Sequence, residues 1–581
     1  MEHKPISKKV TYIYFSFVGV LFVFCCLTGR ELARKGNLQW TTTYTVGTLL
    51  LSLAAGIVLG TVICKAVWLL TERQSGNLMS ERDSKTQSRK GWIYRSSQGA
   101  FYACSLFLIT LAWLPSYLAY YPAICAYDFP VQLAQISLHE YVDHHPIAHT
   151  LLIRLFMKLG ERVLGSVNDG IACFAALQLL FLAAVLAYGM LLLKRFRVRT
   201  VWIVGMQLLS MLYPFHWYMS ISITKDTIFT GFFLLQIFAL LVLLLEERRE
   251  SGWKRTDVLL FLSSVGMILF RNNGKYAMMV LLVIELLALW KGKSTRGLMG
   301  RLFIVSIAAF LMGNVLLAGL FRVTDARQGD RREMLSVPIQ QLARCMLYHG
   351  GVGILPEDDG TMREEDADMI RRFLADESYR FYQADFADPV KRHVNTSAAL
   401  GEAGGFIKTY LHLFAQYPGD YVNAVLLLDA GYLYPEDESH AYVNQVDYAP
   451  GKGYAQTRWA ENEIAQYGFH KASKWEWLHE RLEQWAEDNG HLKLPIVKYM
   501  LVPGTFLWAY LLLAGVFMIK RVRMCLPLSL VLGYYITMLL GPVVQLRYIY
   551  PVMVMMPFLA LLGIADRDET DSNKGREHEE I

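Results

Sequence analysis

The stretch "TYIYFSFVGVLFVFCCLTG", residues 11–29, contains no charged side chain. A helix needs about 20 apolar residues to cross the hydrocarbon core of a bilayer, and this segment has that length. Few basic residues precede it and no small-residue cleavage site follows it, so we expect a retained span rather than a cleaved signal peptide. The stretch therefore predicts an integral membrane protein.

The whole chain agrees with that prediction. Of its 581 residues 54% are hydrophobic and only 19% are charged, whereas soluble domains are about one quarter charged. We expect an α-helical polytopic membrane protein with about 12 spans. The predicted spans are 10–28, 44–70, 101–120, 169–193, 201–219, 227–245, 257–270, 275–290, 302–320, 498–519, 525–541 and 548–564.

Basic connections between the spans predict the orientation. An excess of Lys and Arg marks cytoplasmic loops, and five alternate connections carry one, which places both termini in the cytoplasm. These connections are 71–97, 194–199, 246–255, 291–301 and 520–523. One predicted external connection, residues 29–40, disagrees because it holds Arg30, Arg34 and Lys35. Residues 147–165 have basic and apolar side chains on opposite helical faces, which predicts a helix in the membrane interface rather than a span.

A long polar insert interrupts the spans. Residues 323–497 hold 17 Lys and Arg against 28 Asp and Glu, a net charge of −11, which leaves +17 on the rest of the chain. We expect an α-rich extracytoplasmic domain there. The expected organisation is 1–97 (two spans and a basic loop), 98–322 (transmembrane core with a first external loop at 120–167), 323–497, 498–565 (three spans) and a disordered tail at 566–581.

A narrow polar line follows Asp128 in the first external loop. If a helix begins there, Asp128, Gln132, Gln135 and His139 fall within a stripe about 60° wide, surrounded by apolar side chains. Such a stripe is typical of a helix that faces an enclosed polar site. Asp is also a favoured helix N-cap, which would account for Asp128 but not for the glutamines.

Four further polar clusters fall on the predicted external side, each at the end of a span. Carboxylate and imidazole groups can bind a divalent cation, so Asp143, His144 and His145 are a candidate metal site, although such histidines also cap interfacial helices. Cations with amide neighbours suit an anionic ligand such as phosphate, although turns and aromatic belts explain parts of this pattern. The remaining candidates for substrate binding are Lys225, Asp226, Arg271, Asn272, Asn273, Lys275, Arg547 and Tyr548.

One site for an anion and a polar substrate explains all five clusters together. The basic side chains would hold a lipid phosphate, and Asp128 would accept a proton from an incoming hydroxyl group. Glu140 and Asp143 are the other nearby carboxylates. A bound metal ion is compatible with this arrangement, and the sequence itself names no cofactor.

At these residues the chain resembles the GT-C superfamily of integral membrane glycosyltransferases, and more closely a group of bacterial multispan proteins of that type. The resemblance rests on "YYPAICAYDFPVQ" (120–132), "HHPIAHTLL" (144–152), "SITKDTIF" (222–229), "RNNGKYA" (271–277), "EMLSVPIQQLAR" (333–344), "YPGDYVNA" (417–424) and "QLRYIYPVMVMMP" (545–557). It covers residues 100 to 565, and the first two spans look like an addition.

The resemblance implies a function. It places Asp128 as the catalytic acidic residue, Lys225, Arg271 and Arg547 beside the donor phosphate, and the insert near the acceptor. The expected activity moves a sugar from a polyprenyl-phosphate carrier to a glycan, lipid or protein acceptor outside a bacterial cytoplasmic membrane. A transporter or flippase for lipid-linked glycans and a non-enzymatic cell-envelope assembly protein are the alternatives, and a nucleic-acid partner is not expected.

Overall fold

The computed structural model describes residues 6–77, 92–126, 128–245, 255–291, 296–329, 332, 335–441 and 464–564. These residues form helices, and their extended pairings are isolated bridges such as that between Ile124 and Ser222. An α-helical membrane protein is therefore confirmed. The predicted tail at 566–581 lies outside the described residues.

Nine helices in the described ranges are long and apolar enough to cross a membrane. A tenth crossing is formed if the bent pair α24 (Pro495–Leu501) and α25 (Gly504–Lys520), with an 83° bend, is one span. The nine are α1 (Lys8–Lys35), α2 (Thr42–Asn77), α5 (Gln98–Ala119), α8 (Val167–Arg195), α11 (Lys225–Leu245), α13 (Asn272–Lys291), α14 (Arg296–Thr324), α26 (Cys525–Leu539) together with the preceding turn η7 (Val522–Met524), and α27 (Leu546–Ile564).

Two of the twelve predicted spans are shorter helices. The span predicted at 201–219 divides into α9 (Thr200–Leu212) and α10 (Pro214–Met219), because a residue before proline is driven out of the helical region. The span predicted at 257–270 is α12 (Arg255–Phe270), with 16 residues. At 1.5 Å per residue, α9 and α12 reach about 20 and 24 Å, less than the roughly 30 Å of a bilayer core. Of the twelve predicted spans, nine or ten therefore correspond to helices in the described ranges that are long and apolar enough to cross a membrane.

The bundle is built around α11. This helix is apolar on all sides, which is typical of a fully enclosed helix, and 83% of its most apolar window is buried. It packs against α8, α12 and α27. Phe233 and Phe238 of α11 lie in the same buried core as Tyr534 of α26 and Phe558 of α27. The beginning of α11 is thereby fixed beside the beginning of α27.

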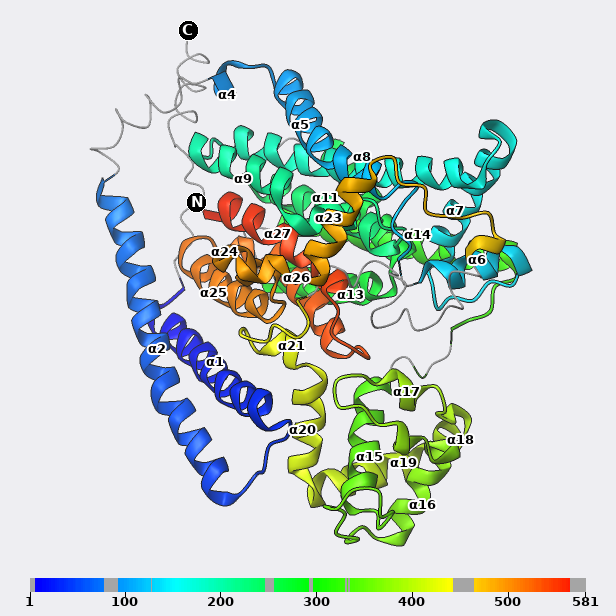
Figure 1. Cartoon of the computed structure of the whole chain (residues 1–581). Coiled ribbons are helices and arrows are strands. Elements are labelled where there is room, and N and C mark those ends of the chain that lie inside the picture. The colour runs from blue at the N-terminus through cyan, green and yellow to red at the C-terminus, as the bar shows by residue number, and fades with distance from the viewer. Residues whose placement is uncertain are drawn as a thin grey trace.

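The first two helices form a hairpin at the side of the bundle (Figure 1). They cross closely because Gly19 faces Gly56, and a Cβ atom at Gly19 would lie 2.2 Å from the Gly56 carbonyl oxygen. Gly56 and Gly60 are four residues apart, the small-residue spacing that lets membrane helices approach. The phenyl ring of Phe15 packs on Gly515 of α25 and joins the hairpin to the bundle.

The predicted external domain divides into two parts. The first consists of α15 (Ser336–His349), α16 (Glu364–Phe373), η3 (Ala375–Phe381), α17 (Asp388–Lys391), α18 (Thr396–Gly401), α19 (Ala403–Gln416) and α20 (Pro418–Leu428). It has its own apolar core from Ile339 to Tyr421 and stands apart from the bundle in Figure 1. In the second part, α21 (Ala430–Leu433) and α23 (Glu476–Glu487) supply Tyr432 and Ala486 to the bundle core. The separate domain is therefore narrower than residues 323–497.

The first loop contains two helices, as predicted. They are α6 (Phe129–Leu138) and α7 (Ile147–Leu159), and a π-helical turn, η1 (Gly160–Leu164), follows α7. The bridge from Ile124 to Ser222 holds the loop beside the beginning of α11. Asp128 and Lys225 are thereby brought to the same place.

Candidate functional site

Asp128 lies between two cations that are distant in the sequence. Its Oδ2 atom accepts a hydrogen bond of 2.7 Å from Lys225 Nζ and one of 3.1 Å from Arg547 Nη1. Arg547 Nη2 donates to the other carboxylate oxygen at 3.3 Å. His145 Nδ1 lies 3.8 Å from Oδ2 and 3.3 Å from Lys225 Nζ. The other four predicted clusters therefore each bring a side chain to Asp128, three of them directly and Arg271 through Asp226.

The capping explanation for Asp128 does not hold in this structure. Asp128 precedes α6 and Pro130 occupies the first turn, but the Asp128 side chain makes no capping hydrogen bond. Its carboxylate turns instead toward α11 and α27. The side chain is therefore held by charge pairing and not by the end of the helix.

A second carboxylate, Asp226, continues the network at the beginning of α11. Asp226 forms an ion pair with Arg271, which directly precedes α13, and its Oδ2 atom lies 3.8 Å from Arg547 Nη1. Thr224 donates a 3.0 Å hydrogen bond to the same oxygen. Arg547 therefore stands between Asp128 and Asp226. We call Asp128, Lys225, Asp226, Arg271 and Arg547 the Asp128 cluster.

Aromatic rings cover the two arginines. The Arg271 guanidinium lies 4.6 Å from the centre of the Tyr548 ring and 5.8 Å from the rings of Phe229 and Tyr534. The Arg547 guanidinium lies 5.0 Å from the same Tyr548 ring. Cations over aromatic faces are stabilised electrostatically, more so where water is excluded. Tyr548, one of the predicted site residues, therefore lies in the site, where its ring contacts both arginines.

The cluster carries one surplus positive charge. Three cations face two carboxylates, which gives a net charge of +1, and the side-chain exposures run from 0% for Asp226 to 14% for Lys225. The Nε atom of Arg271 is also buried without a hydrogen-bond partner. Burial of an unbalanced charge is costly. An anion bound here would supply both the missing charge and an acceptor for Arg271.

The charges around Asp128 set its protonation state. Burial alone would raise its pKa, but Arg547 and Lys225 hold the pKa of Asp128 well below its usual value. Burial lowers the pKa of His145 well below its usual value, so its imidazole is neutral at pH 7. As arranged here, Asp128 is an ionised counter-charge and a weak base.

Gln132 and Gln135 lie on α6 behind Asp128 and differ from each other. Gln132 donates a 2.9 Å hydrogen bond to Thr150 Oγ1 and lies 3.0 Å from His149 Nδ1, so it joins α6 to α7. Gln135 is buried and its Oε1 atom has no hydrogen-bond partner. Gln135 is the glutamine that remains available for a ligand.

Three predicted site residues that follow Arg271, namely Asn272, Asn273 and Lys275, lie outside the Asp128 cluster. Asn272 is exposed, and Asn273 donates a 3.0 Å hydrogen bond to Thr537 Oγ1 of α26. Lys275 is half-buried, and its charge acts on Asp143 rather than on the Asp128 cluster. Of this segment, Arg271 is the residue that enters the Asp128 cluster.

The predicted metal site is not formed. Among the described residues no group of three or more His, Cys, Asp or Glu side chains could hold a metal ion. His145 faces Asp128, His144 is exposed, and one carboxylate oxygen of Asp143 is buried without a hydrogen-bond partner. Burial raises the pKa of Asp143 to about 6. The rings of His144 and His145 lie 4.7 Å apart, but among the described residues they form no group of three metal-ligating side chains with Asp143.

Gln545 and Tyr432 also belong to the site, although neither is among the predicted site residues. Gln545 accepts a 2.7 Å hydrogen bond from Arg547 Nε and so orients that guanidinium. Tyr432 belongs to the insert but is buried in the bundle core, and its hydroxyl group forms hydrogen bonds with the backbone of Gln545. The separate part of the insert also reaches this loop, where Ala387 N–H donates to the Pro542 carbonyl at 2.8 Å. A polar residue two positions before a predicted site arginine was the available clue to Gln545.

The chain belongs to the DUF6020 family, a family of unknown function, whose sequence profile matches residues 139–577. The matched range contains Lys225, Asp226, Arg271 and Arg547 and ends beyond the last span, whereas Asp128 and the α1–α2 hairpin precede it. No curated protein and no solved structure matches the chain.

Proposed function

We propose that this protein is a membrane glycosyltransferase of the GT-C type, which transfers a sugar from a polyprenyl-phosphate carrier to an acceptor on the external side of a bacterial cytoplasmic membrane. The observation that carries the proposal is the Asp128 cluster. It combines one carboxylate that can be released as a base with three cations, one of which is in excess. Phosphate esters are recognised by such cations.

The geometry supports a role for donor binding in activating Asp128. The donor phosphate would take over Lys225 and Arg547, the two cations that Asp128 now holds. Without these partners the carboxylate regains the basicity that charge pairing removes. Binding of the donor and preparation of the base are then one event.

The chemical step follows from these positions. The acceptor hydroxyl oxygen attacks the anomeric carbon, and the bond from that carbon to the phosphate oxygen breaks. The bonding electron pair leaves with polyprenyl phosphate, whose negative charge is stabilised by Arg271 and Arg547. The hydroxyl proton passes to Asp128. Proton transfer to a positioned base typically contributes about 10²- to 10⁴-fold in rate.

A direct assay tests the proposal. Purified protein in detergent is incubated with a radiolabelled polyprenyl-phosphate sugar and an extract of extracytoplasmic glycans and lipids. We expect loss of label from the carrier, with release of polyprenyl phosphate, and no such loss with Asp128→Asn. Asp420→Asn removes a carboxylate from the separate part of the insert; it is the matched control and should retain activity. Equal turnover by all three proteins would contradict the assigned site.

One observation favours the transporter alternative. Glu285 lies within α13, is buried, and accepts a 3.1 Å hydrogen bond from Ser306 of α14, while its other carboxylate oxygen has no partner. Ionisable groups inside the membrane often lie on transport or proton pathways. Movement of a fluorescent lipid-linked sugar across proteoliposomes, abolished by Glu285→Gln with Asp128→Asn unaffected, would favour that function over transfer.

A further inference from the structure

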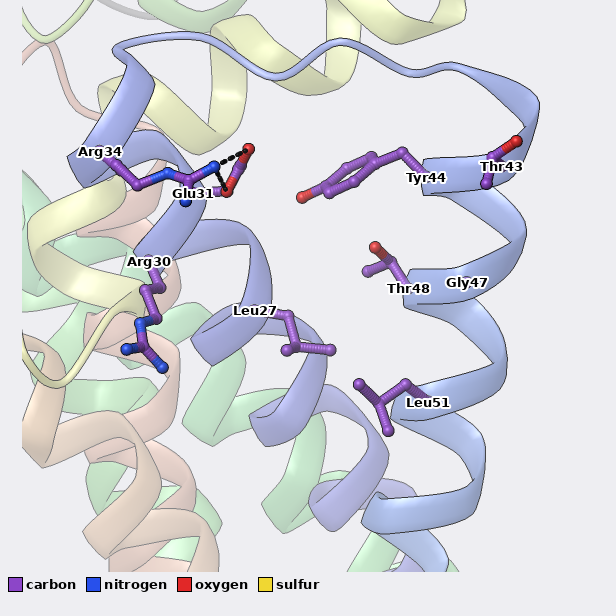
Figure 2. Close-up of a pocket in the computed structure, with 9 residues that line it drawn as sticks. All are labelled: Leu27, Arg30, Glu31, Arg34, Thr43, Tyr44, Gly47, Thr48 and Leu51. Carbon is purple, nitrogen blue, oxygen red and sulfur yellow. Dashed lines mark hydrogen bonds and ion pairs between the residues drawn. The ribbon is translucent and has the colours of Figure 1, made fainter.

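A cavity of about 400 Å³ lies between α1 and α2 where the two helices are joined. Its lining includes Leu27, Glu31, Arg34, Tyr44, Thr48 and Leu51, and Figure 2 shows these side chains along the gap between the two helices. The cavity belongs to the hairpin that precedes the matched family range of 139–577. It is therefore separate from the Asp128 cluster, and nothing below depends on the proposed transferase activity.

The end of the cavity near the connection is polar and positively charged. Glu31 pairs with Arg34 at 3.4 Å and with Lys35 at 2.6 Å, so its carboxylate is already balanced. Arg30 also lines the cavity and makes no ion pair with the described residues. Among the lining residues two cations, Arg30 and Arg34, accompany one carboxylate, Glu31, which leaves a net charge of +1.

An orphaned donor faces the same space. The Tyr44 side chain is half-buried, and its hydroxyl oxygen is shielded from solvent and makes no hydrogen bond within 3.5 Å, with Thr48 as its polar neighbour in the cavity. In Figure 2 the Tyr44 side chain extends from α2 across the gap toward Glu31 and Arg34. A buried hydroxyl without a partner costs free energy, so a ligand with an acceptor oxygen at this place would relieve that cost.

The other end of the cavity is apolar. Leu27 and Leu51 line it from the two helices (Figure 2). Beyond them the outer face of α2 exposes Leu49, Leu50 and Leu53, at 49%, 61% and 49%. A free phosphate ion would leave this apolar end unfilled. A ligand with a phosphate at one end and hydrocarbon chains at the other matches both ends.

A phosphate-containing ligand in this cavity would explain why the connection at 29–40 is basic. It is the one predicted external connection rich in Lys and Arg, against the usual charge bias. Cations beside a membrane surface are attracted to anionic lipid headgroups by about 1 kcal/mol each. We propose that the cavity between α1 and α2 binds a membrane phospholipid, with its phosphate beside Arg30, Arg34 and the Tyr44 hydroxyl and its acyl chains along Leu27, Leu51 and the face of α2.

Short-chain lipids test the proposal on the purified full-length protein. Dioctanoyl phosphatidylglycerol and dioctanoylglycerol have the same chains and differ in the phosphoglycerol headgroup. Bound lipids are counted by native mass spectrometry during titration, with inorganic phosphate added as a competitor. We expect one phosphatidylglycerol to bind in preference to dioctanoylglycerol, and millimolar phosphate to displace it poorly. Equal binding of the two lipids, or full displacement by phosphate, would overturn the proposal.

A charge variant locates the site. Arg30→Gln with Arg34→Gln should weaken binding of phosphatidylglycerol by about fivefold for each cation removed. Lys9→Gln with Lys65→Gln removes the same charge from exposed positions at the opposite end of the hairpin and should leave the affinity unchanged. The same loss in both double variants would show a general surface attraction and reject a specific site.

A filling variant tests the cavity without changing charge. Gly47 lines the cavity, and a Cβ atom added there meets nothing within 4 Å, so Gly47→Leu can fold while it occupies the space. It should abolish the preference for phosphatidylglycerol. Gly205 of α9 is equally open, so Gly205→Leu is the matched control and should bind like the parent protein. Undiminished binding by Gly47→Leu, with folding verified by its thermal transition, would contradict the proposal.

Discussion

Two polar clusters in this protein are built from the same kinds of side chain but differ in net charge. In the separate part of the insert (α15–α20), Asp420 accepts a hydrogen bond from Arg344 Nε at 2.8 Å and faces His349 Nε2 at 2.9 Å, and His349 Nδ1 faces Asp359 at 3.0 Å. We call Arg344, His349, Asp359 and Asp420 the Asp420 cluster. With His349 protonated, two cations meet two carboxylates and the cluster is neutral. The Asp128 cluster has three cations for two carboxylates.

We infer from this difference that the Asp420 cluster is a structural network and that the Asp128 cluster binds a ligand. The Asp420 cluster is closed, because both histidine nitrogens have carboxylate partners and the ring stacks on Tyr417 at 3.8 Å. The Asp128 cluster keeps a surplus charge and an orphaned Arg271 Nε in a buried place. Folding alone gives no reason to bury an extra cation. The surplus therefore indicates a ligand, and the predictions below test whether it does.

The largest effect is expected for Asp128→Asn, which raises the surplus from +1 to +2. Removal of one partner from a buried ion pair typically costs about 3–5 kcal/mol, so the free energy of unfolding should fall, and transfer should slow by about 10²- to 10⁴-fold. Binding of a non-hydrolysable donor analogue should become tighter, because no carboxylate competes for Lys225 and Arg547. Thermal unfolding with and without the analogue measures both effects.

The matched change in the balanced cluster is Asp420→Asn. It should destabilise the separate part of the insert, since Arg344 and His349 lose their shared partner, without tightening analogue binding. An analogue that stabilises both variants equally would mean that the surplus at Asp128 does not select an anion.

The next effect concerns the cations. Arg271→Ala and Arg547→Ala should each weaken donor affinity about ten- to a hundredfold, because a hydrogen bond to a charged group contributes roughly 1.5–3 kcal/mol. Lys at either position should restore part of the affinity, since it keeps the charge but loses the planar fork. Arg344→Ala removes an equally buried guanidinium from the balanced cluster and should leave affinity unchanged. Isothermal titration with the donor analogue measures all of these affinities, and unchanged binding in both site variants would exclude them from the site.

Sequence reasoning went furthest where a residue type was out of place. The sequence shows four charges at the ends of apolar segments, namely Asp128, Lys225, Arg271 and Arg547. The predicted arrangement of spans places all four on the same side of the membrane. The partners themselves are 97 and 419 residues apart, so no local pattern could pair them. The N-cap explanation for Asp128 was equally reasonable from its neighbours, and only long-range contacts decide against it.

The remaining differences arise from tertiary packing. Pro214 ends α9 early, and the apolar composition on both sides concealed the break. Tyr432 lies within the acidic insert, yet it is buried in the membrane bundle, because a polar average over 323–497 hides one short apolar helix. The predicted metal site rested on three residues adjacent in sequence, and among the described residues they form no metal-ligating group of three, because sequence spacing does not fix side-chain directions.

The two clusters should respond oppositely to pH. Burial alone would lower the pKa of His349, but its hydrogen bonds to Asp420 and Asp359 raise that pKa above its usual value. Stability from His349 is therefore present below about pH 6.5 and is lost as the pH rises through the raised pKa. Burial lowers the pKa of His149 to about 3 and that of His145 well below its usual value. These histidines are protonated only on unfolding, so stability near the Asp128 cluster falls as the pH drops below about 6.5.

Hydrogen exchange at several pH values, corrected for intrinsic rates, resolves the two regions in one sample. Protection of α15 should weaken from pH 6 to pH 8, while protection of α6 and α7 should weaken from pH 7 to pH 5. His349→Gln should remove the first trend and leave the second. Parallel trends in both regions would mean that the histidine environments are not distinct.

The smallest effect separates the two glutamines of α6. Gln132 bonds to Thr150 and His149, so Gln132→Leu should lower the free energy of unfolding by about 1 kcal/mol, the net value of a typical hydrogen bond, with little change in donor affinity. Gln135 has a buried Oε1 without a partner, so Gln135→Leu should leave stability unchanged or raise it slightly. If Gln135 faces the ligand, the same change should weaken donor binding severalfold. Chemical denaturation and analogue titration of the two variants give the four values needed. A stability loss at Gln135 with unchanged affinity would make both glutamines structural and restrict ligand binding to the charged cluster.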